Sequence, residues 1–387
     1  MTMPIGFDFQ PRTRVIFGAG TVDRVGELAR AIGTNALLVT DAGIVAAGHV
    51  ERARRRLDAA GVSVTIFDRV RENPTTREVD ECLEVARAVR PDLIIGLGGG
   101  SSMDTAKGCN FILTNGGRMQ DYWGVGKATK PMLPLIAVPT TAGTGSECQS
   151  FALIADEETH QKMACGDPKA APCVAILDPL LTVTQPRQVA ACTGIDAVAH
   201  AVETAVTKKR NELSWLYSRE AFRLTAANLD HVFRQPEDIE ARAAMQLGAA
   251  YAGTAIENSM LGAAHSAANP LTARFGVIHG QAVGIMLPHI VRFNAQRPDA
   301  AAIYAELAKF AGLAAWRDRT EQAVEALIAR IKSLLQAGQM PLSLSALNIS
   351  PSRLPKLAEE AAGQWTAQFN PRPITTSDFE AIYAAAL

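Results

Sequence analysis

Hydrophobic and polar positions follow different patterns in the two halves of the chain. In the first half, short runs rich in Val, Ile and Leu are separated by longer amphipathic stretches, which is the order expected of β-strands joined by helices. This alternation is typical of a parallel sheet covered by helices. The expected strands are 36–40, 62–67, 93–97 and 135–139, and the helices between them include 78–89 and 101–113.

The second half reads as helical throughout. From about Gln188 onward the strand signals end, and long Ala- and Leu-rich amphipathic segments replace them. Ser377 and Glu380 have the spacing of a capping box for the last helix. The expected helices are 212–227, 236–256, 300–310, 320–335 and 378–386.

The change of pattern near Gln185 and Pro186 predicts a domain boundary. A chain of 387 residues exceeds the size at which one hydrophobic core usually stops growing. We therefore expect an α/β domain over 1–186 and an all-helical domain over 187–387.

The composition is that of an ordinary globular protein. Hydrophobic residues make up 48% of the chain, charged residues 20%, and the formal net charge is -1, so no surplus of positive charge favours nucleic acid as a partner. The first residues contain no apolar leader, and no stretch is apolar enough to span a bilayer. The six cysteines form no C-x-x-C pair and indicate free thiols in a reducing compartment. We expect a cytoplasmic protein that binds neither nucleic acid nor membrane.

One carboxylate and three histidines in the second half have the character of a metal site. Asp196 and His200 are four residues apart in a helical stretch, so both side chains lie on one helix face. His265 and His279 follow downstream. Each histidine alone is more often a hydrogen-bonded structural residue, but the joint set favours a borderline divalent cation over Mg²⁺ or Ca²⁺. We expect Fe(II) or Zn(II).

A glycine-rich turn in the first half is a candidate phosphate site. It follows the expected strand 93–97 and opens a helix, where free N–H groups and the helix dipole favour a pyrophosphate. Its spacing is not the G-x-G-x-x-G of the Rossmann motif, and a tight turn without a ligand is the alternative. The candidate cofactor residues here are Gly98, Gly99, Gly100, Ser101 and Asp104.

Polar side chains also follow two other expected strands. Hydroxyl groups after the strand 135–139 are placed to bind the nicotinamide or ribose side of the same ligand. Asp41 follows the strand 36–40, where a carboxylate accepts hydrogen bonds from a ribose 2'-hydroxyl and repels a 2'-phosphate. The pattern favours NAD over NADP, although Asp41 also fits a simple strand end. The hydroxyl-bearing candidates are Thr140, Thr141, Thr144 and Ser146.

Three of these segments match the motifs of a known family. The chain resembles the iron-containing (group III) alcohol dehydrogenases: Gly98 to Lys107 matches their G-G-G-S-x-x-D-x-A-K motif, Pro139 to Glu147 matches P-T-T-x-G-T-G-S-E, and Thr193 to His200 matches T-G-x-D-A-x-x-H. The resemblance runs from Phe17 to Arg372. It implies a dehydroquinate synthase-like architecture, with an N-terminal dinucleotide-binding domain, an all-helical metal domain and a catalytic cleft between them.

The resemblance also implies roles for single residues. Asn73 and Lys162 fall at positions that face the cofactor in the family, and Phe151 and Ile256 fall at positions that border the substrate. Their apolar side chains favour an alkyl or otherwise uncharged alcohol. Trp123, Trp365 and Thr366 are weaker pocket candidates and fit packing roles better. Relatives form dimers through their N-terminal domains, so the resemblance implies a homodimer.

One position departs from the family pattern. Relatives usually carry a further histidine four residues after the third metal ligand, where it helps to move a proton near the nicotinamide. Here that position, four residues after His265, is Asn269. An amide does not titrate near neutrality, so this proton path is in question while all four ligands are kept.

These observations predict reversible hydride transfer between NAD and a small primary alcohol or aldehyde. The metal, held by Asp196, His200, His265 and His279, would act as a Lewis acid on the substrate oxygen. The main alternative is a lyase of the dehydroquinate-synthase type, which would need several basic residues near the ligands. The ligand helices offer few basic residues, and Arg274 is the nearest of them. A second alternative is an inactive scaffold that only binds nucleotide.

Overall fold

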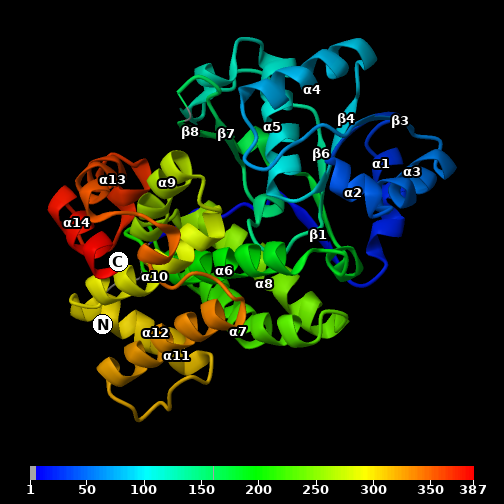
Figure 1. The fold of residues 1–387 in the computed structure, drawn as a ribbon. Coiled ribbons are helices and arrows are strands. Elements are labelled where there is room, and N and C mark those ends of the chain that lie inside the picture. Colours follow the sequence, from blue (N-terminus) through cyan, green and yellow to red (C-terminus); the bar gives the residue numbers. More distant parts are fainter. Residues whose placement is uncertain (1–5, 160) are drawn as a thin grey trace. The chain divides into compact units, whose positions relative to one another are not determined.

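The computed structural model describes residues 6–159 and 161–387. They form two compact units (Figure 1). The α/β unit comprises Gln10–Gln185, and the helical unit comprises Pro186–Leu387 together with residues 6–9. The predicted fold class, a parallel-sheet domain followed by a helical domain, is confirmed.

A six-stranded sheet forms the centre of the α/β unit. Its strand order is β1-β9-β6-β4-β2-β3, and every neighbouring pair is parallel. The four predicted strands correspond to three of its inner strands and one edge strand: β2 (Asn35–Val39), β4 (Leu93–Gly98) and β6 (Leu135–Pro139) are inner, and β3 (Ser63–Phe67) is at the edge.

Helices cover both faces of this sheet. Alternate side chains of β2 face opposite layers: Leu37 packs in a core with residues of α4 (Thr76–Val89) and α5 (Gly100–Asn115), whereas Leu38 packs with residues of α1 (Val25–Arg30) and α3 (His49–Ala59). A short helix, α2 (Ala42–Ala46), follows β2. Burial on both faces explains why the inner strands are continuous apolar runs.

Several strands were not predicted from the sequence. β1 (Arg14–Phe17) and β9 (Val174–Leu177) extend the main sheet, while β5 (Gly124–Val125), β8 (Lys162–Gly166) and β7 (Phe151–Ala155) form a second, three-stranded sheet. β7 and β8 pair antiparallel. These segments have only two to five residues and weak alternation. Their strand conformation depends on pairing with distant neighbours rather than on a local pattern.

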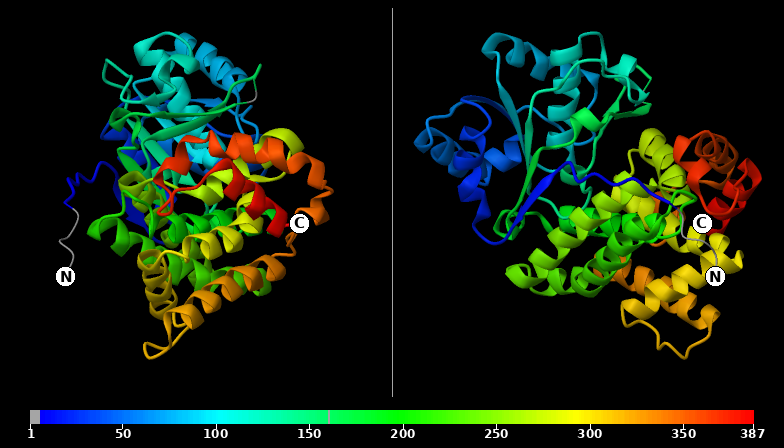
Figure 2. Two further views of the ribbon diagram at one scale, coloured as in Figure 1. Left: turned by 90° about the vertical axis from the view of Figure 1, so that its left-hand side faces the viewer. Right: turned by 180° about the vertical axis from the view of Figure 1, so that it is seen from behind.

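Every regular element from Pro186 to Leu387 is helical. The central helix, α6 (Arg187–Thr204), packs against its neighbours α7, α8 and α10 (Figure 2). Most of its residues are buried. Its Ala- and Val-rich sequence has small side chains that allow this close packing. The other α-helices are α7 (Glu212–Arg234), α8 (Ile239–Ser259), α9 (Ala263–Phe275), α10 (His279–Asn294), α11 (Pro298–Phe310), α12 (Thr320–Ala337), α13 (Leu354–Ala362) and α14 (Thr376–Ala385).

The predicted capping box of the last helix is wrong by two residues. Helix α14 begins after Thr375, whose N–H donates to the carboxylate of Asp378 at 2.8 Å while its Oγ1 accepts from the backbone N–H of Asp378 at 3.3 Å. Ser377 and Glu380 therefore lie inside the helix. Two overlapping Ser/Thr-x-x-Asp/Glu patterns exist here, and only the extended backbone at Thr375 decides between them.

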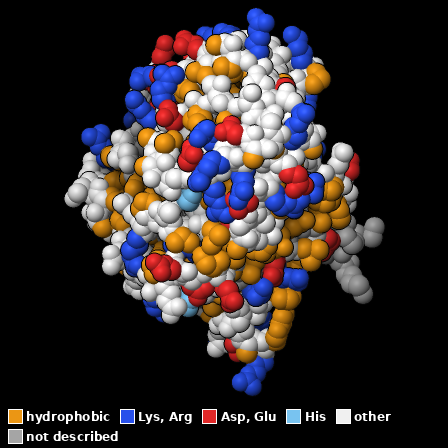
Figure 3. All heavy atoms as spheres, turned by 90° about the vertical axis from the view of Figure 1, so that its right-hand side faces the viewer, with side chains coloured by type: hydrophobic (Ala, Val, Ile, Leu, Met, Phe, Trp, Pro, Cys, Tyr) orange, Lys and Arg blue, Asp and Glu red, His pale blue; other side chains and the backbone are white. Residues whose placement is uncertain are grey.

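Charged side chains of both signs are interspersed on the molecular face in Figure 3. On α3, for example, Arg54 forms ion pairs with Glu51 and Asp58 at 2.9 and 2.8 Å. All six cysteines carry free thiols. Among the described residues, no helix combines the length and the hydropathy that crossing a bilayer requires.

Candidate functional site

Helix α6 supplies the first part of a buried polar cluster in the helical unit. Asp196 and His200 are one turn apart, and Oδ1 of Asp196 lies 3.5 Å from Nε2 of His200. Both residues are buried among the small apolar side chains of the helix. The i, i+4 spacing read from the sequence therefore places both groups at one point of the helix surface.

Two further helices bring the remaining histidines to Asp196. His265 lies in the first turn of α9, with Nε2 at 3.3 Å from Oδ1 of Asp196. His279 is the first residue of α10, and its Nε2 lies 3.9 Å from the same oxygen. The next residue, Gly280, explains this approach, because a Cβ there would lie 2.1 Å from the backbone oxygen of Cys192 on α6. Only glycine lets α10 begin so close to α6.

The donor set fits a transition-metal ion. Donor atoms about 2.0 to 2.2 Å from one tetrahedrally bound ion lie roughly 3.4 Å apart. Here the carboxylate oxygen of Asp196 lies 3.3 to 3.9 Å from three imidazole nitrogens. The donor atoms of Asp196, His265 and His279 all fall within 4.8 Å of one another. One carboxylate with imidazole nitrogens is a ligand set for iron or zinc rather than for a hard oxygen-seeking cation.

The charges of the cluster depend strongly on one another. Burial alone would raise the pKa of Asp196, but the neighbouring histidines, His200 foremost, hold it well below its usual range. Burial alone would lower the pKa of His265, but the carboxylates of Glu203 and Asp196 outweigh it and raise the pKa to about 9. The two carboxylates therefore favour positive charge at this point of the cluster.

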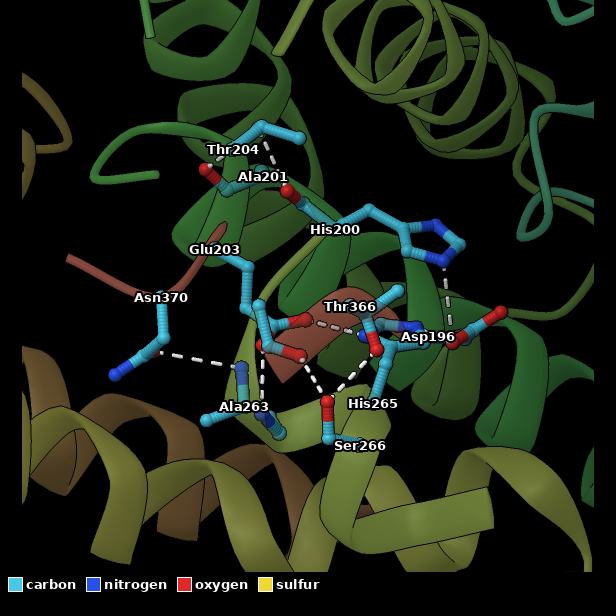
Figure 4. A network of polar contacts seen from close by, with 12 residues as sticks. Asp196, His200, Ala201, Glu203, Thr204, Ala263, His265, Ser266, Thr366 and Asn370 are labelled. Carbon is cyan, nitrogen blue, oxygen red and sulfur yellow. Dashed lines mark hydrogen bonds and ion pairs between the residues drawn. The ribbon is translucent and has the colours of Figure 1, made fainter. Parts of the chain in front are cut away.

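Glu203 is a member of the cluster that the sequence reasoning missed. Its Oε2 contacts Nδ1 of His265, and its Oε1 accepts a hydrogen bond from the backbone N–H of Ala264 at 2.7 Å (Figure 4). Glu203 is seven residues after Asp196, so it shares the helix face of Asp196 and His200. A buried acidic residue at this spacing in an apolar helix was the available signal.

The C-terminal segment Gln364–Asn370 holds α9 through three polar contacts. The N–H of Ala263 donates to Oδ1 of Asn370 at 3.4 Å, and the hydroxyls of Ser266 and Thr366 lie 2.7 Å apart (Figure 4). Nδ2 of Asn269 donates to Oε1 of Gln364 at 3.0 Å. The segment thereby fixes the helix that carries His265. Thr366 is buried in this contact, and Trp365 is partly exposed beside it.

Most of the predicted cofactor residues of the α/β unit lie near the carboxyl ends of β2, β4 and β6, whereas Asn73 and Lys162 do not. Gly98 ends β4 with φ of 152°, and a Cβ there would lie 2.4 Å from the hydroxyl of Ser102. The glycine turn is joined to the loop after β6, because Thr140 donates its N–H to the Gly98 carbonyl at 2.9 Å. The structure also places Gly99 against Thr141 and Gly100 against Thr144, and Ser101 follows in the first turn of α5.

Asp41 lies at the same end of the sheet, after the carboxyl end of β2. Its Oδ1 accepts hydrogen bonds from the N–H groups of Gly43 and Ile44 at 2.9 and 3.1 Å and so caps helix α2. Its Oδ2 lies 3.4 Å from the hydroxyl of Ser102, beside the glycine turn. Asp41 is therefore both a helix cap and a carboxylate next to the candidate phosphate site.

Asp104 and Ser146 belong to a buried network around Lys107. Nζ of Lys107 lies 2.7 to 2.9 Å from four oxygens of residues 146, 149 and 151. The hydroxyl of Ser146 donates to Asp104 at 2.7 Å, and the N–H of Leu153 donates to the other carboxylate oxygen at 3.3 Å. Next to this network, burial raises the pKa of Glu147 to about 7. The network holds the loop after β6 against α5.

The remaining candidates lie elsewhere in the two units. Asn73 has a left-handed backbone with φ of 53° just before α4, and Lys162 begins β8 opposite Ala155. Phe151, at the start of β7, is buried against Gly166, and Ile256 is buried in α8. Trp123 is exposed next to the short strand β5.

Comparison with known proteins gives consistent similarities over the whole chain. Residues 11–179 match the family "Iron-containing alcohol dehydrogenase", and residues 190–387 match "Fe-containing alcohol dehydrogenase family, C-terminal". The chain is 34% identical to the NAD-dependent methanol dehydrogenase of Bacillus methanolicus, over 98% of this chain and 99% of that protein. It is 32% identical to the lactaldehyde reductase of Escherichia coli, over 96% and 97% of the two chains.

A solved structure gives the same result. The crystal structure of a 1,3-propanediol oxidoreductase matches with a TM-score of 0.95 at 33% identity, and the match covers 99% of this chain and 100% of that chain.

Proposed function

The chain belongs to the iron-containing alcohol dehydrogenase family, and from this premise we propose that it transfers a hydride between NAD and a small primary alcohol or aldehyde. The observation that carries the proposal is the convergence of one buried carboxylate and three imidazoles from three helices. We assign the metal, Fe(II) or Zn(II), to Asp196, His200, His265 and His279.

The chain's own residues prepare the helical unit for this reaction. A divalent ion at this site supplies Lewis-acid chemistry toward the oxygen of an alcohol or aldehyde. Asp196, His200 and His265 are buried, which keeps their donor atoms in a medium where electrostatic interactions are stronger than in water. His279 is partly exposed, with 21% of its side chain accessible, so the cluster is open to solvent on the side of His279.

The loops of the α/β unit supply the dinucleotide site. We assign the pyrophosphate to the turn of Gly98, Gly99 and Gly100 with Ser101, because glycines allow close backbone approach and the N-terminus of α5 favours an anion. Thr140, Thr141 and Thr144 lie beside this turn and donate from the neighbouring loop. We assign Asp104 and Ser146 as positioning residues, which hold the loop after β6 in place through the Lys107 network. Asn73 and Lys162 are the more distant cofactor contacts.

Asp41 sets the preference for NAD. Its second carboxylate oxygen lies beside the glycine turn, where it accepts hydrogen bonds from a ribose and repels a 2'-phosphate. Its first oxygen is already used to cap α2, so the side chain is held in one orientation.

Asn269 cannot act as a titrating relay. Its amide donates to Gln364, and no carboxamide gains or loses a proton near neutrality. The substrate proton therefore leaves by a route in which Asn269 serves only through hydrogen bonds. We expect an activity profile without a histidine titration at this position.

The substrate is a small uncharged alcohol or aldehyde. Phe151 and Ile256 are apolar residues that we assign to the wall of the substrate pocket. The relatives are named for methanol and lactaldehyde, which supports a short-chain substrate. Their names describe dehydrogenases and reductases, and this favours a redox reaction over the lyase alternative.

We also propose a cytoplasmic homodimer. β1 is an edge strand of the main sheet, and its Val15 and Phe17 residues are 46% and 42% exposed. An exposed apolar edge strand is a surface that a second copy can cover. Light scattering during gel filtration measures the mass, and a monomer at micromolar concentration would contradict this assembly.

Anaerobic purification with elemental analysis, followed by an alcohol and aldehyde screen with NAD and NADP, tests the proposal. We expect about one iron or zinc per chain and net NAD reduction with short primary alcohols. A metal-free protein, or turnover without net change in NAD, would contradict it. NAD binding without turnover on the whole panel would support the inactive-scaffold alternative.

A further inference from the structure

Besides Asp196, Glu203 is the buried carboxylate among the described residues of the helical unit, and the proposed metal site does not use it directly. It is 3% exposed and lies on the same face of α6 as Asp196 and His200. Its two oxygens reach the first turn of α9: one contacts Nδ1 of His265, and the other accepts from the N–H of Ala264 at 2.7 Å (Figure 4). The carboxylate thus joins α6, which carries Asp196 and His200, to α9, which carries His265.

Close packing leaves this carboxylate little freedom. A Cβ at Gly262 would lie 3.2 Å from Oε1 of Glu203 and 3.3 Å from Oδ1 of Asn370. The absence of a side chain at Gly262 therefore makes room for the carboxylate against the start of α9. Because the backbone N–H of Ala264 also donates to Oε1, the orientation of Glu203 is fixed from two directions.

This contact determines which nitrogen of His265 is available to an ion. A carboxylate can only accept, so Nδ1 of His265 carries the proton. In the neutral ring, Nε2 then has the free lone pair. Nε2 is the atom that lies 3.3 Å from Asp196, on the side of the cluster. Glu203 therefore selects the tautomer in which His265 can bind a metal.

Glu203 also changes the charge of the site. With three neutral imidazoles, Asp196 and Glu203 give the buried cluster two negative charges. A divalent ion neutralises both charges, whereas a buried uncompensated charge is costly. Removing the charge of Glu203 would leave the same ion with one positive charge in excess.

We propose that Glu203 is a positioning residue of the metal centre, which strengthens binding of a divalent ion by orienting His265 and by supplying the second buried negative charge. The inference rests on the proposed metal site and goes beyond it, because Glu203 does not itself bind the ion. Such outer carboxylates commonly change metal affinity by about 10- to 100-fold.

The test compares Glu203→Gln with Glu203→Asp, using the dissociation constants of Zn(II) and Co(II) measured by competition with a chelator. Glu203→Gln keeps the shape but removes the charge, and we expect both ions to bind about 10- to 100-fold more weakly. Glu203→Asp restores the charge with a shorter side chain, so it should recover part of this loss. The visible spectrum of bound Co(II) should change in Glu203→Gln, since the imidazole of His265 is no longer held by a carboxylate.

Ser218→Ala is the matched control. Ser218 is buried on α7, and its hydroxyl lies 2.7 Å from that of Thr204, the residue after Glu203, whereas its other hydrogen bond goes to the Ser214 carbonyl. This variant should bind both ions like the parent. If Glu203→Gln does not fold, the comparison of Glu203→Asp with Ser218→Ala still tests the proposal. The proposal requires that Zn(II) and Co(II) bind more weakly to Glu203→Asp but not to Ser218→Ala.

Two results would overturn the proposal: binding by Glu203→Gln within twofold of the parent, or equal losses in Glu203→Gln and Glu203→Asp. His265→Ala separates this failure from a failure of the metal site itself. If His265→Ala keeps its metal, the proposed ligand set is wrong. If His265→Ala loses the metal while Glu203→Gln keeps it, only the role of Glu203 is wrong.

Discussion

Each unit of the protein buries a cluster of charged side chains, and the two clusters differ in how their charge is balanced. In the α/β unit, Lys107 is surrounded by four oxygens, and Asp104 accepts from Ser146 and from Leu153. In the helical unit, Asp196 and Glu203 face three imidazoles. The first cluster is balanced by its own side chains, whereas the second needs an added proton or metal ion.

This difference separates a structural charge cluster from a binding site. Burying a charge costs free energy unless a partner compensates it. Where the chain supplies the partner, as for Lys107, removing one member should cost stability. Where an external cation is the partner, as around Asp196, removing one member should cost binding and activity. Variants at His279, Lys107 and Glu147 test the two sides of this comparison.

The largest effect is expected from His279→Ala. The cluster loses one of its four assigned ligands, so bound metal should fall below stoichiometry and kcat/KM should fall by three to four orders of magnitude, about 4 to 5 kcal/mol. The control is His289→Ala, which removes a partly buried histidine from the same helix, ten residues away. It should keep its metal. Elemental analysis and steady-state kinetics measure both variants, and normal metal content in His279→Ala would remove it from the ligand set.

Lys107→Met should instead destabilise the protein. The substitution leaves the oxygens around Nζ without their cation, which should lower the free energy of unfolding by about 3 to 4 kcal/mol. Urea unfolding of the metal-free protein measures this loss. Lys356→Met, at an exposed ion pair with Glu359, should cost less than about 1 kcal/mol. A stable Lys107→Met protein with weakened metal binding would reverse the assignment of the two clusters.

Glu147 gives the α/β unit a dependence of stability on pH. Burial raises its pKa from 4.5 to about 7, so between these values the native state holds a proton that the unfolded chain has released. The contribution of Glu147 to the free energy of unfolding therefore falls as pH rises through this range, by about 2 to 3 kcal/mol. Glu147→Gln should show a flatter profile in urea unfolding between pH 4.5 and 7.5. Parallel profiles for parent and variant would contradict the shift.

Asp41→Asn tests cofactor selectivity while the helix cap is kept. Asn caps a helix about as well as Asp, so the hydrogen bonds to Gly43 and Ile44 can persist while the charge is lost. The ratio of kcat/KM for NAD to that for NADP should fall by about 5- to 30-fold, or about 1 to 2 kcal/mol. An unchanged ratio at unchanged thermal stability would show that Asp41 acts only as a cap.

The smallest effect is expected at Asn269. Asn269→His should add a pH-dependent limb to kcat/KM near pH 6 to 7, with a change at pH 8 of less than about 1 kcal/mol. Gln364→Leu is the control, because it removes the partner of Asn269 without adding a titrating group. Matching pH profiles in the metal-loaded parent and Asn269→His enzymes would exclude a relay at this position.

Three of the inner parallel strands, β2, β4 and β6, and most helices could be predicted from the sequence because their patterns are local. The predicted strand 135–139 corresponds to β6, and 62–67 differs from β3 by one residue. Several helices are longer than predicted. Helix α7 was predicted to end at 227 but continues to Arg234, and the polar residues of this added part still fit one exposed face of the helix. β7 and β8 could not be predicted in the same way, because each owes its conformation to the other.

The sequence by itself determined the chemistry that single elements can present. Helical periodicity places Asp196, His200 and Glu203 on one face of α6, and strand ends place Asp41 and the glycine turn at one sheet edge. Tertiary structure decided which elements meet. His279 reaches Asp196 because Gly280 lets α10 approach Cys192, and Asn269 meets a partner 95 residues away. The backbone geometry of a helix or strand repeats over a few residues, so the local sequence determines it. Contacts between elements depend instead on how distant side chains pack.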